Sequence, residues 1–177
     1  MNAQAVLAQI RVDNSRTRSD KAQARENLCA AVDRLSCASE ALLLRIPPPE
    51  ILLVEDDANV ARAMARILER ETEAHLTCAS SGEEALILVM GAQAHYDLLI
   101  VDLLLPQMHG LQFIELIRTR SRWPRIPIIA TSGEIEPQAA ARAAFNAGAS
   151  SFYAKPVTMC VLTDDIYKLL QLPRRKG

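Results

Sequence analysis

The regular alternation of short apolar runs with amphipathic stretches constrains the fold of this chain more than any other feature. Five apolar runs recur after residue 50, each followed by a stretch in which apolar residues have helical spacing. Five βα units of this length predict an α/β fold, a doubly wound five-stranded parallel sheet with helices on both faces. The runs are 51–55, 75–79, 96–101, 126–131 and 151–154, and the helical stretches are roughly 59–72, 82–92, 110–121, 137–147 and 158–171.

The length and composition of the chain fit one such domain with an appendage. The chain has 177 residues, of which 50% are hydrophobic, and a formal net charge of −1. It can therefore build a core, but it lacks the basic excess of a nucleic-acid-binding protein. It has no apolar stretch of about 18 residues that could span a membrane, and its N-terminus does not look like a secretory signal. We expect a cytoplasmic protein with no nucleic-acid or membrane partner.

Four cysteines, Cys29, Cys37, Cys78 and Cys160, are spread along the sequence. None belongs to a CxxC pair, and no matching set of histidines accompanies them, which argues against a zinc site. We expect reduced thiols that are largely packed in the interior, as in a cytoplasmic protein.

The sequence "IPPPE" at 46–50 divides the chain into two parts. Prolines end a preceding helix and favour an extended connector. We therefore divide the chain into a helical extension (1–46), a proline-rich linker (47–50), the sheet domain (51–172) and a basic tail (173–177).

The extension carries apolar residues at alternating spacings of four and three, interrupted at Ser39. This heptad-like register favours a two-stranded coiled coil, although it lasts fewer than about three heptads. A second copy or a partner helix would cover the apolar seam; the alternative is an amphipathic helix that packs on its own sheet domain. The seam consists of Leu28, Val32, Leu35, Leu42 and Ile46.

The most apolar part of the chain, "YDLLIVDLLLPQMHG" at 96–110, contains a carboxylate. A bare charge in a dry interior is costly, so Asp102 must lie where the run is exposed or where it leaves the core and finds partners. In doubly wound sheets, ligands bind outside the carboxyl ends of the strands. Asp102 follows "LLIV" directly, which places it at that edge, and Pro106 marks the departing loop.

The first strand ends in a second group of acids, Glu55, Asp56 and Asp57. If the first and third strands are neighbours, Glu55 and Asp56 face Asp102 across one pocket, whereas Asp57 begins the loop. Three carboxylates at short range require either protonation or a bound cation. Oxygen ligands that are partly solvated suit Mg²⁺, so the sequence predicts a magnesium site at this edge.

The fourth and fifth strands bring hydroxyls and an ammonium group to the same edge. Thr131 and Ser132 end the fourth strand, and Lys155 follows the fifth. A metal ion, a hydroxyl and a fixed cation are the groups that hold phosphoryl oxygens, and a carboxylate can itself be the nucleophile. Each short motif alone is common in turns and helix caps. Their occurrence at successive strand ends indicates a phosphoryl-transfer site.

Residues 50–172 resemble the receiver domain of two-component response regulators. The resemblance rests on "ILLVEDD", "YDLLIVDLLLPQMHG", "IPIIATSG" and "GASSFYAKPV", which occur in the family's order. It implies the flavodoxin-like strand order 2-1-3-4-5.

The resemblance also implies a role for each matching residue. Asp102 is similar to the phosphoacceptor, with Lys155 and Ser132 completing the reactive set, and the bond between Lys155 and Pro156 is cis in similar proteins. The implied metal ligands are Glu55, Asp56, Asp102 and the backbone carbonyl of Leu104; the implied switch residues are Ser132 and Phe152; Thr131 and Glu134 are secondary polar groups.

Three positions around this set affect how the resemblance is interpreted. His109 occupies a place where many receivers have Asp, which we interpret as a loop variation. Leu104, two residues after the acceptor, is apolar and cannot orient an attacking water, whereas Glu134, two residues after Ser132, is polar. The lifetime of a phosphoryl group on Asp102 therefore stays open.

The implied function is a phosphoacceptor switch and not a metabolic enzyme. A sensor histidine kinase or a phosphotransfer protein would donate the phosphoryl group to Asp102, and the response would pass through protein contacts, since no output domain follows "LLQLPRRKG". We expect a homodimer, formed through the heptad seam or through the face made by 137–147, 151–154 and 158–171.

Three other functions compete with this one. The chain could be a relay intermediate or phosphate sink that binds a kinase through its extension. It could be a Mg²⁺-dependent phosphohydrolase with an Asp nucleophile, but Leu104 occupies the place of the second acid that such an enzyme would use as general acid. It could be a degenerate scaffold, but the acids, the hydroxyl and the lysine are all present.

Overall fold

The computed structural model describes residues 47–92, 94–121 and 123–173. From Pro48 onward the chain forms one compact unit. The expected helical extension, its heptad seam and most of the basic tail lie outside the described residues, so those predictions stay predictions.

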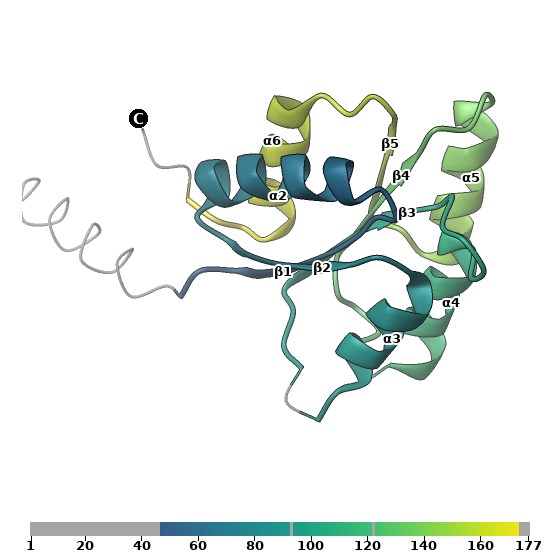
Figure 1. Cartoon of the computed structure of the whole chain (residues 1–177), viewed down its shortest axis with the longest axis horizontal. Helices are drawn as coiled ribbons and strands as arrows, with labels where there is room; N and C mark the ends of the chain where they lie inside the picture. Colours follow the sequence, from purple (N-terminus) through teal and green to yellow (C-terminus); the bar gives the residue numbers. More distant parts are fainter. Residues whose placement is uncertain (1–46, 93, 122, 174–177) are drawn as a thin grey trace, which may run out of the picture. The chain divides into compact units, whose positions relative to one another are not determined.

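Five parallel strands form a single sheet in the order β2-β1-β3-β4-β5, which confirms the expected fold (Figure 1). Both neighbours of β1 are in register with it, with Val54 opposite Ala79 on one side and opposite Val101 on the other. The carboxyl ends of β1 and β3 therefore meet at one edge. The strands are β1 (Glu50–Val54), β2 (His75–Ala79), β3 (Leu98–Asp102), β4 (Ile128–Ser132) and β5 (Ser151–Ala154).

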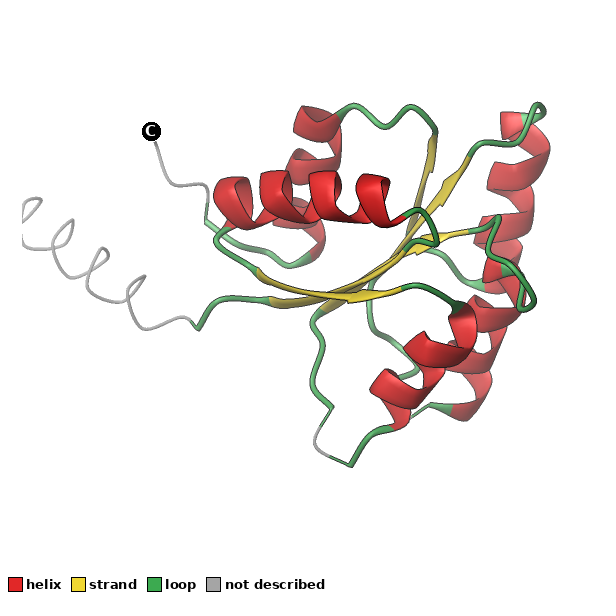
Figure 2. Ribbon diagram, viewed as in Figure 1, coloured by secondary structure: helices red, strands yellow, loops and turns green. Residues whose placement is uncertain are grey.

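Helices cover both faces of the sheet (Figure 2). Helices α2 and α6 pack on one face and α3, α4 and α5 on the other, as expected for parallel strands joined by right-handed crossovers. The helices are α2 (Ala58–Thr72), α3 (Gly82–Met90), α4 (Gly110–Arg120), α5 (Pro137–Ala147) and α6 (Met159–Leu169). In the described ranges, none of them is long and apolar enough to cross a bilayer.

The alternation of side chains along each strand divides the core between the two faces. In β1, Ile51 and Leu53 contribute to the cluster beneath α2 and α6, whereas Leu52 and Val54 contribute to the cluster beneath α3, α4 and α5. All five residues of β3 are buried, including Asp102. Burying both faces explains why the central strands are apolar without interruption.

Helix ends at the carboxyl edge are set by short polar side chains. Asp57 caps α2 by accepting hydrogen bonds from the amides of Asn59 and Val60 at 2.8 and 3.2 Å. It therefore ends the short loop at 55–57 and does not begin it as expected, and its side chain is engaged by the helix. Ser81 caps α3 in the same way through the amide of Glu84.

Some sequence-based expectations differ from the structure. The third and fourth strands begin two residues later than expected, at Leu98 and Ile128. The reason is that an apolar run indicates which residues are buried, and not which of them form hydrogen bonds with a neighbouring strand. We placed Glu50 in the proline-rich linker, but in the structure it is the first residue of β1. The expectation of packed thiols is wrong for Cys78 and Cys160, which are free and exposed. Cys78 lies on β2, an edge strand that is paired on one side only.

Candidate phosphoacceptor site

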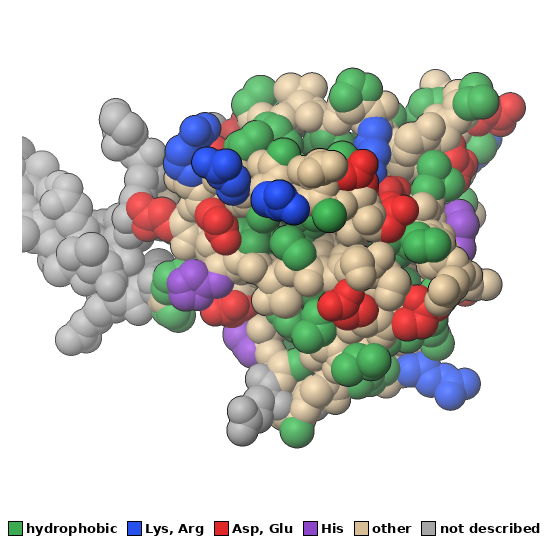
Figure 3. Space-filling view, in the orientation of Figure 1, with side chains coloured by type: hydrophobic (Ala, Val, Ile, Leu, Met, Phe, Trp, Pro, Cys, Tyr) green, Lys and Arg blue, Asp and Glu red, His purple; other side chains and the backbone are tan. Residues whose placement is uncertain are grey.

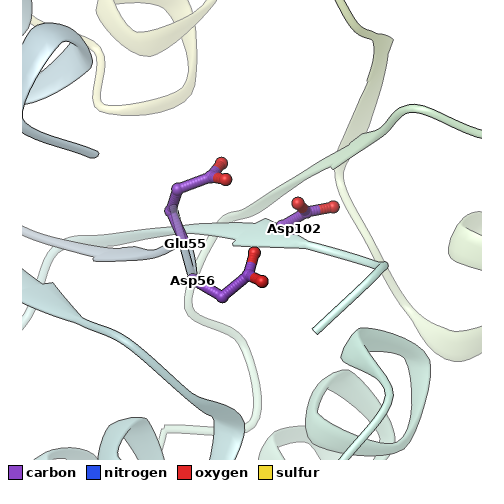
Figure 4. A group of neighbouring side chains, drawn as sticks. All are labelled: Glu55, Asp56 and Asp102. Carbon is purple, nitrogen blue, oxygen red and sulfur yellow. The ribbon is translucent and has the colours of Figure 1, made fainter. Parts of the chain in front are cut away.

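Two neighbouring strand ends bring three carboxylates together, as the sequence predicts. Glu55 and Asp56 follow β1, and Asp102 is the last residue of β3. One oxygen from each lies within 4.8 Å of the others, and Figure 4 shows the three side chains close together at this edge. Glu55 and Asp102 are buried, whereas Asp56 is exposed at the mouth of the cluster.

Lys155 joins two of these carboxylates. It follows β5, and its Nζ donates to Glu55 Oε2 and to Asp102 Oδ2, each at 2.6 Å. The lysine side chain is 24% exposed, against 3% for Glu55 and 5% for Asp102, so these ion pairs are well shielded from water. The backbone amide of Lys155 donates to the Ser132 carbonyl at 2.7 Å, and the Lys155–Pro156 bond is cis.

The pKa directions reflect this crowding. Burial raises the pKa of Glu55, the nearby charges of Asp102 and Asp56 raise it further, and Lys155 opposes them without cancelling them. Burial alone would lower the pKa of Lys155, but its hydrogen bonds and attraction to Asp102 and Glu55 outweigh burial and raise it. The lysine is therefore held as a cation, and the cluster retains an excess of negative charge.

The loop after β3 fixes the other oxygen of Asp102. The amide of Leu104 donates to Asp102 Oδ1 at 3.0 Å, and the amide of Leu103 donates to the Thr131 carbonyl at 2.8 Å. The side chain of Leu104 is exposed. A ligand role for the Leu104 carbonyl stays a prediction.

Gly110 supports this loop, and our sequence analysis assigned it no role. Its amide donates to the Leu103 carbonyl at 2.9 Å. A Cβ at Gly110 would collide with the carbonyl oxygen of Asp102 and lie 2.6 Å from Leu103 Cα. Helix α4 can therefore begin this close to the end of β3 only with glycine at position 110. The signal in the sequence was a glycine at the start of an expected helix.

The structure places the hydroxyl residues at this edge in different environments. Ser132 is buried at the end of β4, and its Oγ accepts from the amide of Glu134 at 3.2 Å. The Thr131 hydroxyl donates back into the sheet, to the Val101 carbonyl at 3.5 Å. Phe152, the expected switch aromatic, is partly buried against the core on the α3–α4–α5 side.

The cluster opens to solvent along a groove between α2 and the edge strand β2. The groove has a volume of about 470 Å³ and an apolar floor that includes Ala61, Ala65 and Leu76. Glu55 and Asp56 line it together with Arg62 and Arg66. Figure 3 shows a row of basic side chains over α2, whose exposed arginines are Arg62, Arg66 and Arg70. Glu55 and Asp56 therefore border this groove, whereas Asp102 does not line it.

The donor set fits a divalent cation. It offers three carboxylate oxygens with no sulfur or nitrogen ligand among them, which is the chemistry that Mg²⁺ prefers. The single lysine faces three carboxylates, and burial, with the nearby charges of Asp102 and Asp56, raises the pKa of Glu55. A cation at Asp56, Asp102 and Glu55 would restore the balance.

The geometry agrees with the comparison to known families. Residues 51–167 match the sequence profile of the response regulator receiver domain. The chain belongs to the response regulator receiver family. The receiver is a signalling domain of two-component systems and not a conventional enzyme, and the resemblance in sequence is thereby confirmed.

Relatives from plants and bacteria share this domain. The chain is 32% identical to the two-component response regulator ORR11 of Oryza sativa subsp. indica over 110 residues, covering 62% of this chain and 73% of the relative. It is 34% identical to the transcriptional regulatory protein ResD of Bacillus subtilis over 107 residues, covering 60% of this chain but only 42% of ResD. A match to YcbL of Bacillus subtilis likewise spans 46% of that protein.

Solved structures agree with the fold. A response regulator receiver protein from Pseudomonas putida matches 70% of this chain and 98% of its own, with a TM-score of 0.63 and 28% identity. The chemotaxis response regulator CheY4 of Vibrio cholerae matches 69% of this chain and 98% of its own at a TM-score of 0.61, and its 23% identity supports the fold alone.

Proposed function

We propose that this receiver accepts a phosphoryl group on Asp102 and changes conformation in response. One observation carries the proposal: Asp102 is buried beside two further carboxylates, and its Oδ2 is held at 2.6 Å by Lys155. An aspartate that only capped a helix or a loop would not need two acids and an ammonium group around it.

The chemistry is an in-line transfer between two nucleophiles. A carboxylate oxygen of Asp102 attacks the phosphorus of a phosphohistidine on a sensor kinase or phosphotransfer protein. The new P–O bond forms as the P–N bond breaks, and the imidazole nitrogen keeps the electron pair and takes up a proton. Lys155 is positioned to hold an oxygen of the transferred group, because it already contacts Asp102.

Glu55, Asp56 and Asp102, with the Leu104 carbonyl, are the residues that would hold Mg²⁺. The bound ion would supply positive charge to the incoming phosphoryl oxygens. Asp56 is the exposed member of the set and so the first that an entering ion meets. Glu55, buried and paired with Lys155, orients the lysine as well as adding charge.

Ser132 and Phe152 are the proposed switch residues. Phosphorylation adds nearly two negative charges and three acceptor oxygens, and the Ser132 hydroxyl at the end of β4 is a donor for one of them. Its movement would change the space available to Phe152 and shift a pre-existing equilibrium at the surface formed by α5, β5 and α6. Phe145 and Val161 are already exposed on this surface, at 52% and 48%.

The wider setting is also a proposal. We expect a cytoplasmic protein that signals through protein contacts. A homodimer through the heptad seam or the α5–β5–α6 surface stays a prediction, as does a relay or phosphate-sink role in which the extension binds a kinase.

Incubation of the full chain with acetyl phosphate and Mg²⁺ tests the proposal. Wild type should gain the mass of one phosphate per chain, and this phosphate should be lost in alkali. Asp102→Asn should gain no mass. Retention of the label in Asp102→Asn would refute the assignment.

The same preparation tests the phosphohydrolase alternative. A phosphohydrolase would release many equivalents of product from a small phosphate ester, whereas a receiver should stop near one phosphate per chain. Sustained turnover that depends on Asp102 would favour the enzyme.

A further inference from the structure

The two ends of helix α5 are held very differently. Its buried side chains, Ala140, Ala144 and Ala147, are all alanines, whereas the neighbouring α4 buries Phe113 and Ile117. Alanine removes little apolar area from water. Apolar packing therefore fixes α5 weakly, and the polar contacts at its ends decide how it can move.

The C-terminal end of α5 is tied down by a guanidinium group from α4. Arg118 donates from Nε and Nη2 to the Gly148 carbonyl at 2.9 and 2.7 Å. A cation at a helix C-terminus is favourable in the field of the helix dipole. Gly148 has φ of 107°, and a Cβ there would lie 2.8 Å from Arg118 Cγ. The close approach therefore depends on both residues.

Arg118 is not an ordinary surface arginine. Its Nη1 is buried and has no hydrogen-bond partner in the described part of the chain, and burial lowers its pKa. A desolvated guanidinium that keeps two short bonds to one carbonyl is a strong attachment.

The same end is also fixed to the sheet. Ser150 donates its amide to the Ile128 carbonyl at 2.7 Å and accepts the Ile128 amide on its Oγ at 3.2 Å. The end of α5 is thus connected to α4 and to the beginning of β4.

The N-terminal end of α5 lacks comparable attachments among the described residues. Its N-cap residue, Glu136, makes no side-chain capping hydrogen bond, and the preceding Ile135 is 99% exposed. This end follows Ser132 by a short loop, in which the amide of Glu134 donates to Ser132 Oγ. A displacement of Ser132 therefore acts directly on the loose end of the helix.

We propose that α5 pivots about its C-terminal end, where Arg118 holds Gly148, when the domain switches. Arg118 is then a positioning residue that keeps the response at the N-terminal half of α5 and in the 133–136 loop. The inference rests on the proposed function, because the displacement begins at Ser132 after Asp102 is phosphorylated.

Hydrogen exchange on the full chain, read by mass spectrometry, tests the pivot. Wild type, Arg118→Met and Arg118→Lys are compared with and without Mg²⁺ and beryllofluoride. Arg120→Met is the matched control, because Arg120 is an exposed arginine in the same last turn of α4. Arg118→Lys keeps the positive charge but cannot donate two hydrogen bonds in the planar geometry of a guanidinium group. It replaces Arg118→Met in the experiment if that variant does not fold.

In wild type, beryllofluoride should change exchange in peptides covering 133–141 and leave those covering 144–150 unaltered. In Arg118→Met without beryllofluoride, the amides of 144–150 should exchange about tenfold faster, since a charge-assisted attachment is lost. Adding beryllofluoride to Arg118→Met should then change hydrogen exchange along the whole of α5. Arg120→Met should behave as wild type.

Two results would overturn the pivot alone: an equal beryllofluoride response at both ends of α5 in wild type, or unchanged exchange of 144–150 in both Arg118 variants. If wild type neither takes up phosphate from acetyl phosphate nor responds to beryllofluoride, the proposed function has failed and the pivot falls with it.

Discussion

The strands β1 and β3 carry acids at both of their ends, yet only one end looks like a reactive site. At the amino edge, Glu50 pairs with His75 at 2.9 Å and Asp97 pairs with His95 at 3.2 Å. At the carboxyl edge, Glu55 and Asp102 share Lys155, with Asp56 alongside. Both edges carry carboxylates, and they differ because those of Glu55 and Asp102 are buried around one shared ammonium group.

At the amino edge each carboxylate contacts its own imidazole; the histidine side chains are 65% and 63% exposed, and the carboxylates 37% and 36%. Exposed pairs of this kind are screened by water and contribute little to stability. At the carboxyl edge one ammonium serves two buried carboxylates, so charge remains uncompensated. Under the proposed function, this excess of negative charge would attract a divalent cation, and the bound cation together with Lys155 would offset the charge of a phosphoryl group.

The largest effect should come from removing the shared cation. Lys155→Met leaves Glu55 and Asp102 buried together without a counter-charge, which should lower the free energy of unfolding by about 3–5 kcal/mol at neutral pH without Mg²⁺. Urea unfolding followed by the fluorescence of Trp123, the single tryptophan, measures it. A loss below about 1 kcal/mol would mean that the ion pairs of Lys155 contribute no more to stability than exposed pairs such as those at the amino edge.

Mg²⁺ should stabilise the wild-type chain through the carboxyl edge. At a concentration one hundred times its Kd, the ion should add about 2.7 kcal/mol to the free energy of unfolding. Asp56→Asn should reduce this gain, and Glu50→Gln, at the other end of β1, should leave it intact. An equal reduction in both variants would show that the two edges do not differ in metal binding.

The pH dependence of Glu55 sharpens the comparison. Because its pKa is raised in the folded chain, the folded state holds this proton more tightly than the unfolded state. The resulting stabilisation is complete below the unfolded pKa of about 4.3 and is lost as pH rises through the folded pKa.

Glu55→Gln has no carboxyl group at this position and so should not lose stability through its ionisation. Without Mg²⁺, the variant should therefore become more stable relative to wild type as pH rises from 4 to 8. Thermal unfolding across this range measures it, with Glu50→Gln as control. A difference that stays constant with pH would contradict the raised pKa.

The smallest effects should come from the amino edge. His75→Gln and His95→Gln should each change the free energy of unfolding by no more than about 0.5 kcal/mol. Urea unfolding at neutral pH measures them beside Lys155→Met. A cost of several kcal/mol for either histidine would show that exposure does not separate the two edges.

The sequence was sufficient to predict the sheet and the edge that carries the site, because both depend on local patterns. An apolar run such as 51–55 indicates a strand that is buried on both faces of the sheet. Acidic residues directly after such a run indicate where the strand leaves the core. The same patterns could not give strand ends to the residue: Ile126 is buried with the core but precedes β4.

Sequence reasoning placed the distant acids and the lysine at one edge, but it could not say which of their atoms are in contact. Lys155 lies 100 residues from Glu55 and 53 from Asp102, and no local pattern indicates that one ammonium contacts both. Arg118 and Gly148 are 30 residues apart, and each has an ordinary local role in a helix end. The exposure of Cys78 depends on β2 being an edge strand, which a hydrophobic pattern does not reveal.

Borohydride reduction of the phosphorylated chain tests the central claim most directly, because it converts an aspartyl phosphate to homoserine and so marks the acceptor. After treatment with acetyl phosphate and Mg²⁺, peptide mass spectrometry should find homoserine at position 102 and leave Asp56 and Asp97 unmodified. Homoserine at Asp97, at Asp56, or nowhere in a chain that has gained phosphate would contradict the account.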